Sequence, residues 1–114
     1  MKSRSPEEYE KVKGFHKGLL GFTQESFIGD VGEVYIDKFI QIYGASPQVF
    51  SCIQYDSLWQ LGYALDLAVS RGFDYEDPVT LNDILRSTRF TGCTGNVSLD
   101  KSSNDRTYSG FAIF

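Results

Sequence analysis

Side chains suited to metal or redox chemistry are scarce in this sequence. It contains one histidine and two cysteines, Cys52 and Cys93, with no Cys-x-x-Cys pair and no histidine–cysteine cluster at metal-ligand spacing. We therefore expect no bound metal ion and no cofactor. Each cysteine is expected to act as a small buried hydrophobic side chain. A Cys52–Cys93 disulfide remains the alternative, because the sequence does not give the distance between their Cα atoms.

Long apolar runs and excess basic charge are also missing. No apolar stretch approaches the ~20 residues that cross a bilayer. The N-terminus lacks the apolar region of a signal peptide, so we expect neither a signal peptide nor a transmembrane segment in this chain. The 15 acidic and 11 basic residues give a net charge of −4, which disfavours a nucleic-acid partner. No nucleophile elbow, phosphate-binding loop or dinucleotide fingerprint occurs, and we expect a protein that is not an enzyme.

The residues that are present suit one globular domain. The chain has 114 residues, of which 41% are hydrophobic, and nine Phe, seven Tyr and one Trp supply apolar area for a core. Periodic apolar residues predict four amphipathic helices. A capping box of Asp30 and Glu33 is expected to start the second, and Ser51 with Gln54 the third. The predicted helices cover 5–14, Asp30 to Gly44, 51–71, and a segment that starts at Pro78.

The predicted strands are fewer and shorter than the helices. Residues 18–24 have the pattern of an extended segment, and 96–100 with 107–114 that of a β-hairpin around a turn at 101–105. Wide apolar helix faces need a larger sheet to cover them, so we expect this chain to be part of a larger fold. The isolated chain is accordingly predicted to be marginally stable or prone to aggregate.

Three segments carry a recognisable order of motifs. Residues 55–68 contain Tyr-Asp-Ser-Leu-Trp before a helical face of small residues, 90–100 read FTGCTGNVSLD, and 104–114 contain Asn-Asp-Arg before a second extended segment. These resemble the YDA helix, the F-x-G-x-T-G-x-V-x-F-D strand and the return strand of the receptor family ligand-binding region, in the periplasmic-binding-protein type I superfamily. The resemblance covers residues 15–114, and 1–14 are expected to be a lead-in helix or loop.

The resemblance implies an α/β fold, here a partial C-terminal portion of one lobe, with helices packed on a small sheet that ends in a β-hairpin. It also implies a non-catalytic segment of a membrane receptor ectodomain, a clamshell that closes on a small-molecule ligand such as an amino acid. The expected partners are that ligand and the remaining lobes of the receptor, and the expected location is extracellular. The alternatives are a fragment of a transporter's soluble substrate-binding protein and a small stand-alone interaction protein.

In the family, the segment that enters the YDA helix borders the ligand cleft. The resemblance therefore points to Phe50, Gln54, Tyr55 and Asp56 as candidate ligand-binding residues. The Tyr55 ring could form a pocket wall, and Gln54 could donate a hydrogen bond to a carboxylate. The structural alternative is that Tyr55 packs in the core and Asp56 accepts hydrogen bonds at a helix terminus.

The last third of the sequence has residues suited to tight turns. Gly92 and Gly95 are expected where a Cβ would clash or where φ is positive. Asp105 is expected to hydrogen-bond turn backbone, and Arg106 to pair with a nearby carboxylate. Asn96 begins an Asn-Val-Ser sequon, a possible N-glycosylation site if the protein is secreted.

Overall fold

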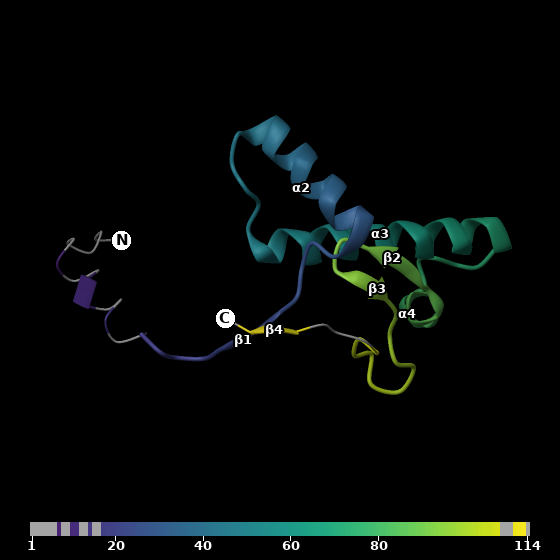
Figure 1. The fold of residues 1–114 in the computed structure, drawn as a ribbon. Coiled ribbons are helices and arrows are strands. Elements are labelled where there is room, and N and C mark those ends of the chain that lie inside the picture. Colours follow the sequence, from purple (N-terminus) through teal and green to yellow (C-terminus); the bar gives the residue numbers. More distant parts are fainter. Residues whose placement is uncertain (1–6, 8–9, 12–13, 15–16, 108–110, 114) are drawn as a thin grey trace.

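Figure 1 shows the fold of the computed structural model, which describes residues 7, 10–11, 14, 17–107 and 111–113. The lead-in helix predicted for 5–14 lies largely outside these residues. In chain order the elements are β1 (Phe22–Gln24), α2 (Gly29–Tyr43), α3 (Val49–Arg71), α4 (Pro78–Ser87), β2 (Phe90–Gly92), β3 (Gly95–Val97) and β4 (Phe111–Ile113).

The strands form two separate antiparallel pairs. β1 pairs with β4, with Thr23 opposite Ala112, and β2 pairs with β3, with Thr91 opposite Asn96. The β2–β3 pair lies against the helices, in contact with both α2 and α3. The expected fold class, a mixed α/β arrangement of helices with a small sheet, is confirmed.

The predicted hairpin around 101–105 forms in part. The Thr107 N–H donates to the Ser98 carbonyl at 3.0 Å, and Leu99 and Arg106 form an antiparallel bridge. The extended pairing differs from the prediction, because β3 pairs with β2 in a tight hairpin and β4 pairs with β1. The physical reason is a short β2–β3 turn at Cys93 and Thr94, which long-range bonds hold in place and which the alternating pattern downstream does not indicate.

Local signals gave the C-termini of the helices correctly but not the N-termini of α2 and α3. Gly44 and Gly72 end α2 and α3 with positive φ angles of 70° and 69°, as glycine permits. The residues before α2 and α3 are Ile28 and Gln48, which make no side-chain capping hydrogen bond. Both predicted capping boxes are therefore wrong. At the start of α2, the N–H groups of Phe27 and Ile28 bond to Cys52 and Cys93 instead.

The apolar core lies mainly between α3 and α4. Ala64 and Ala68 of α3 are fully buried and pack with Ile84 of α4, and Leu67, Leu81 and Leu85 surround them. Asp77 caps α4 by accepting hydrogen bonds from the Thr80 hydroxyl and backbone N–H, which lower the pKa of its carboxyl. Alanines at this contact let the two helices approach closely.

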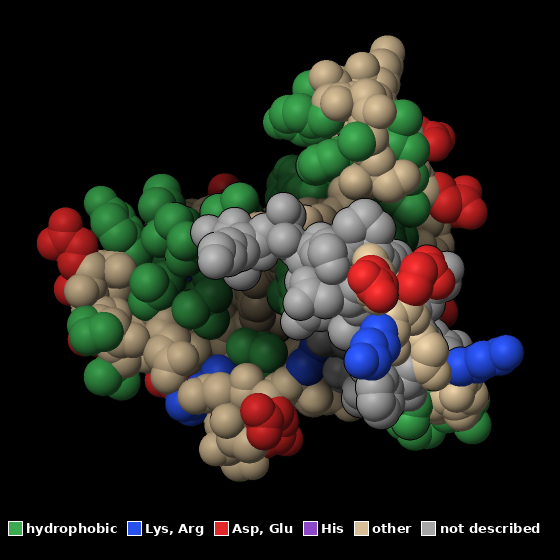
Figure 2. All heavy atoms as spheres, turned by 90° about the vertical axis from the view of Figure 1, so that its left-hand side faces the viewer, with side chains coloured by type: hydrophobic (Ala, Val, Ile, Leu, Met, Phe, Trp, Pro, Cys, Tyr) green, Lys and Arg blue, Asp and Glu red, His purple; other side chains and the backbone are tan. Residues whose placement is uncertain are grey.

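Much of α2 and the outer side of α3 has no covering layer. Figure 2 shows two areas where hydrophobic side chains gather at the surface. Leu58 is 72% exposed and Ile42 is 70% exposed, although both belong to helices with broad apolar faces. These side chains are left uncovered by the chain itself, in agreement with the expectation that the helix faces are too wide for the small sheet to cover. The exposed large side chains on these helices are Val34, Ile40, Ile42, Tyr43, Val49, Phe50, Leu58, Trp59, Leu61, Tyr63 and Val69.

The turn after β3 is organised by Asp100. Its carboxylate accepts hydrogen bonds from the backbone N–H of Ser102 at 2.8 Å and of Ser103 at 3.0 Å, and its own N–H donates to the carbonyl of Asp105 at 2.7 Å. Asp105 was expected to bond turn backbone with its side chain, but Asp100 has that role. Hydrogen bonds from the Ser102 hydroxyl and from the backbone of both serines lower the pKa of Asp100 from 3.8 to about 2.

This pKa predicts that the turn is stable to acid. Since the folded pKa lies below the unfolded value, the stabilisation by Asp100 is present above about pH 4 and is lost as the pH falls through about 2. The Ser102 and Ser103 amide resonances should therefore titrate with a midpoint near 2 in NMR spectra. Asp100→Asn should abolish that titration, and a midpoint near 3.8 in the unaltered chain would contradict the arrangement.

Candidate functional site

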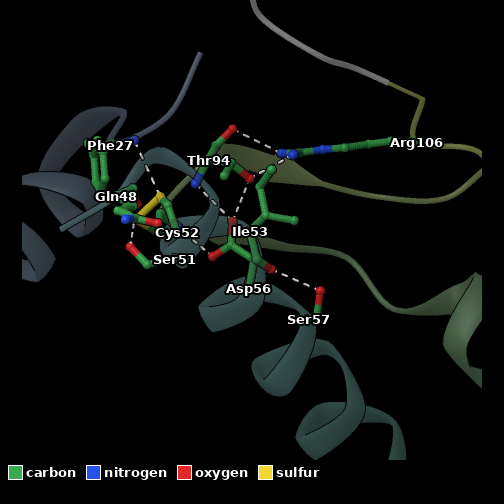
Figure 3. The surroundings of a disulfide bond; sticks show 10 residues. Phe27, Gln48, Ser51, Cys52, Ile53, Asp56, Ser57, Thr94 and Arg106 are labelled. Atoms are coloured by element: carbon green, nitrogen blue, oxygen red, sulfur yellow. Dashed lines mark hydrogen bonds between the residues drawn. A yellow bond between two sulfur atoms is a disulfide. The ribbon is translucent and has the colours of Figure 1, made fainter. Parts of the chain in front are cut away.

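A disulfide joins the beginning of α3 to the β2–β3 turn (Figure 3). Cys52 and Cys93 are fully buried, their Cα atoms are 5.5 Å apart, and they are 41 residues apart in the sequence. The expectation that each is a free, small hydrophobic side chain is wrong, and the alternative pairing is the one that forms. The bond brings together residues that lie on separate elements, which no local sequence pattern could indicate.

Asp56 fixes the same turn to α3 one helical turn further on. Its carboxylate accepts hydrogen bonds from the backbone N–H of Cys93 at 2.6 Å and of Thr94 at 2.8 Å, and also from the Thr94 hydroxyl. The residue is 4% exposed. Its carboxylate therefore acts as an acceptor for the β2–β3 turn, 37 and 38 residues away, and not for a helix terminus as the structural alternative had it.

Glycine is required on either side of this turn, for a different physical reason at each position. A Cβ on Gly92 would lie 2.2 Å from the Asp56 carboxylate oxygen, so only glycine lets the strand approach. Gly95 has a φ of 85°, which L side chains rarely adopt. Arg106 donates to the Thr94 hydroxyl at 2.6 Å and to the Thr94 and Asn96 carbonyls, instead of to the expected carboxylate.

The start of α2 is attached to the disulfide through backbone hydrogen bonds. The N–H of Phe27 donates to the Cys52 sulfur at 3.3 Å, and the N–H of Ile28 donates to the Cys93 carbonyl at 2.8 Å. Phe27 has a φ of 60°, and a Cβ on Gly32 would lie 2.2 Å from the Phe27 carbonyl carbon. The disulfide, Asp56 and these contacts form one junction from which α2 and α3 extend.

A hollow of about 620 Å³ lies along α2 where that helix faces the first turns of α3. Its wall is mostly aromatic and aliphatic, and Asp30 and Lys38 add one acidic and one basic side chain. We call this the aromatic groove. Its lining residues are Asp30, Val31, Val34, Tyr35, Lys38, Phe39, Ile42, Tyr43 and Tyr55.

Aromatic rings run along both helices at a spacing of four residues. On α2 the rings of Tyr35, Phe39 and Tyr43 follow one another, with centroids 6.0 and 4.6 Å apart. On α3 the rings of Tyr55, Trp59 and Tyr63 do the same at 6.1 and 5.6 Å. Tyr35 and Tyr55 join the two rows with centroids 5.0 Å apart, a distance typical of aromatic pairs.

The structure separates the four residues that were expected to border a ligand cleft. Tyr55 lines the aromatic groove, whereas Phe50, Gln54 and Asp56 are not among its lining residues. Phe50 is exposed on α3, and Asp56 is buried at the junction. The α2 side of the groove was missed as a site. The aromatic i, i+4 spacing at Tyr35, Phe39 and Tyr43 was the available signal in the sequence.

The described part of the chain has neither a metal-binding cluster nor a membrane-spanning helix. Among those residues, no three or more His, Cys, Asp or Glu side chains are grouped so that they could hold a metal ion. None of the helices in the same residues has the length and apolar character required to span a membrane.

Comparison with known proteins gives a distant similarity. No family model matches the sequence. Over 59 residues, which are 52% of the chain, it is 30% identical to a Dictyostelium discoideum protein named metabotropic glutamate receptor-like protein E. The matched stretch is 7% of the length of that protein. The similarity is therefore to a receptor-like protein and covers a small part of it.

Proposed function

We propose that residues 15–114 are a non-catalytic, ligand-binding segment of a membrane receptor ectodomain, a clamshell sensor of a small molecule such as an amino acid. The aromatic groove carries this proposal, because it is a large concave surface beside residues of the motif that resembles receptor ligand-binding regions. The similarity to a metabotropic glutamate receptor-like protein supports it.

The Cys52–Cys93 disulfide supports an extracellular location. Disulfides persist in oxidising compartments and are rare in the cytosol, where thiols are kept reduced. This one is fully buried and connects two elements at the centre of the junction, so it is part of the fold. The finding agrees with a segment that lies outside the cell.

The uncovered faces of α2 and α3 support a segment that other lobes complete. Monomeric soluble proteins rarely expose contiguous apolar areas of this kind. Leu58, Ile42 and Val69 are each more than half exposed. A small protein that folds alone would instead cover such residues within its own chain.

The groove also suits the proposed ligand class. An apolar wall with a few polar groups is typical of small-molecule sites. Asp30 could pair with an ammonium group and Lys38 with a carboxylate, while Tyr35 and Tyr55 cover the side chain of the ligand. A free amino acid carries an ammonium group and a carboxylate group on its α-carbon.

The test is amino-acid binding by the native polypeptide that carries this chain, measured by isothermal titration calorimetry with a panel of free L-amino acids that includes L-glutamate. Tyr55→Ala should weaken the best ligand by about tenfold, because truncating a central aromatic removes more than 1 kcal/mol of binding energy. Tyr75→Ala is the matched control, since this exposed tyrosine lies in the loop before α4 and does not line the groove.

The outcomes separate the alternatives. Unchanged affinity in a folded Tyr55→Ala variant would remove the groove from the site, and no binding of any panel member would contradict the amino-acid sensor. Fractionation of the native cells distinguishes the receptor from the transport alternative. The polypeptide is expected in the membrane fraction, and a freely soluble polypeptide that binds an amino acid would favour a transporter's substrate-binding protein.

A further inference from the structure

The sequence contains one Asn-x-Ser/Thr sequon, which starts at Asn96. The structure places Asn96 in the middle of β3, the second strand of the tight hairpin, with an exposed side chain. A sequon is short and often has no consequence. Two features support a role for this sequon: its exposed position in the hairpin, and the disulfide at Cys93 close by.

The two faces of the hairpin are different. On one face, Phe90 lies opposite Val97, the Phe90 ring is 5.2 Å from that of Tyr63 on α3, and Val97 is 6% exposed. Successive side chains of a strand point to opposite faces, so Thr91 and Asn96 form the cross-strand pair on the outer face. Both are exposed.

The contacts of Asn96 hold its backbone and leave its side chain on the outside. The Asn96 carbonyl accepts a hydrogen bond from Arg106 at 2.8 Å, which ties the strand to the chain after the Asp100 turn. The side chain contributes Oδ1 to a long hydrogen bond of 3.4 Å from the Thr91 hydroxyl. A group attached at Nδ2 would therefore extend from the outer face without displacing a core residue.

The disulfide supplies a second observation. Cys93 lies three residues before Asn96 and is bonded to Cys52. Disulfides form and persist in oxidising compartments, and in eukaryotic cells oligosaccharides are attached to sequons in such a compartment. This step rests on the proposed extracellular location.

We propose that Asn96 carries an N-linked oligosaccharide and that the Thr91–Asn96 face of the hairpin faces solvent in the complete protein. In the transfer, Nδ2 of Asn96 forms a bond to the anomeric carbon of a polyprenyl-pyrophosphate-linked oligosaccharide. The bond between that carbon and the pyrophosphate oxygen breaks, the lipid pyrophosphate leaves, and the Nδ2 proton passes to the transferase base. No electrons are exchanged with an outside reagent.

The proposal limits where the remaining lobes can pack. A bulky hydrophilic oligosaccharide excludes a closely packed partner from the face to which it is attached. Polypeptide that covers the exposed side chains of α2 and α3 must therefore approach away from the Thr91–Asn96 face. The uncovered apolar surface and the glycan would then occupy different sides of the segment.

The test uses the chain 1–114 behind a cleavable signal peptide, secreted by cultured eukaryotic cells. Intact mass before and after peptide N-glycosidase treatment should show loss of an oligosaccharide, and peptide mapping should show Asn96 converted to Asp by the enzyme. Asn96→Gln and Ser98→Ala should abolish the modification and Ser98→Thr should retain it. Asn104→Gln, which changes an exposed asparagine outside the sequon, should have no effect.

Secreted, disulfide-bonded chain with unmodified Asn96 would overturn the glycan and leave the receptor proposal intact. Native polypeptide found in the cytosol with Cys52 and Cys93 as free thiols would instead overturn the receptor proposal. If the cells do not secrete the chain, it can be translated in vitro with microsomal membranes. Attachment of the oligosaccharide then appears as slower migration on a gel, and it does not require a folded chain. No shift in that assay would also contradict the proposal.

Discussion

Replacing Cys52 and Cys93 together by alanine should lower the free energy of unfolding by about 4 kcal/mol, the chain-entropy estimate for a cross-link between residues 41 apart. A loss of that size is a large fraction of the roughly 5–15 kcal/mol that stabilises a typical domain. Urea unfolding followed by circular dichroism, without reductant, measures it. Addition of dithiothreitol to the unaltered chain should give a loss of similar size.

The two single variants provide the internal control for this prediction. Because either replacement breaks the same bond, Cys52→Ala, Cys93→Ala and the double variant should lose similar amounts of stability, and the single effects should not add. Effects below about 1 kcal/mol that add independently would show that the cysteines contribute only as separate buried side chains.

Asp56→Ala should destabilise the chain by about 3 kcal/mol or more, because a buried donor left without a partner costs roughly 1–3 kcal/mol. The backbone N–H groups of Cys93 and Thr94 and the Thr94 hydroxyl would all lose their acceptor. Asp66→Ala is the matched control, since this carboxylate is exposed on the same helix and its removal should change stability by less than about 0.5 kcal/mol.

Gly92→Ala tests the same junction from the strand side. The added methyl group would lie 2.2 Å from the Asp56 carboxylate, which its hydrogen bonds hold in place, so a cost of about 2 kcal/mol is expected from overpacking. Urea unfolding measures all these variants. Equal stability of Asp56→Ala and Asp66→Ala would contradict the role assigned to Asp56.

These contacts explain which parts of the fold the sequence could predict. Helix ends at Gly44 and Gly72 and the start of α4 at Asp77 and Pro78 depend on residues within one turn, and local signals identify them. The start of α2 depends instead on bonds from Phe27 and Ile28 to the two cysteines, which no local signal indicates.

The register of the β2–β3 hairpin also depends on residues that are distant in the sequence. The alternation after Asn96 is compatible with several pairings, and the observed one is selected by Asp56 and the disulfide, whose partners lie 37 to 41 residues away. Of the four residues to which the resemblance pointed, Tyr55 lines the aromatic groove and Phe50, Gln54 and Asp56 do not. The opposite wall of the groove is formed by α2. Its prediction would require the direction in which α2 extends from the junction, and long-range contacts set that direction.

Trp59, the single tryptophan of the chain, lies within the aromatic row on α3, between Tyr55 at 6.1 Å and Tyr63 at 5.6 Å. The residue is 47% exposed, on a helix whose outer side the chain leaves uncovered. Excitation absorbed by the neighbouring phenols can pass to this one emitter. Trp59 is thus an intrinsic fluorescent probe. The wavelength of its emission maximum will shift when another protein surface packs against α3.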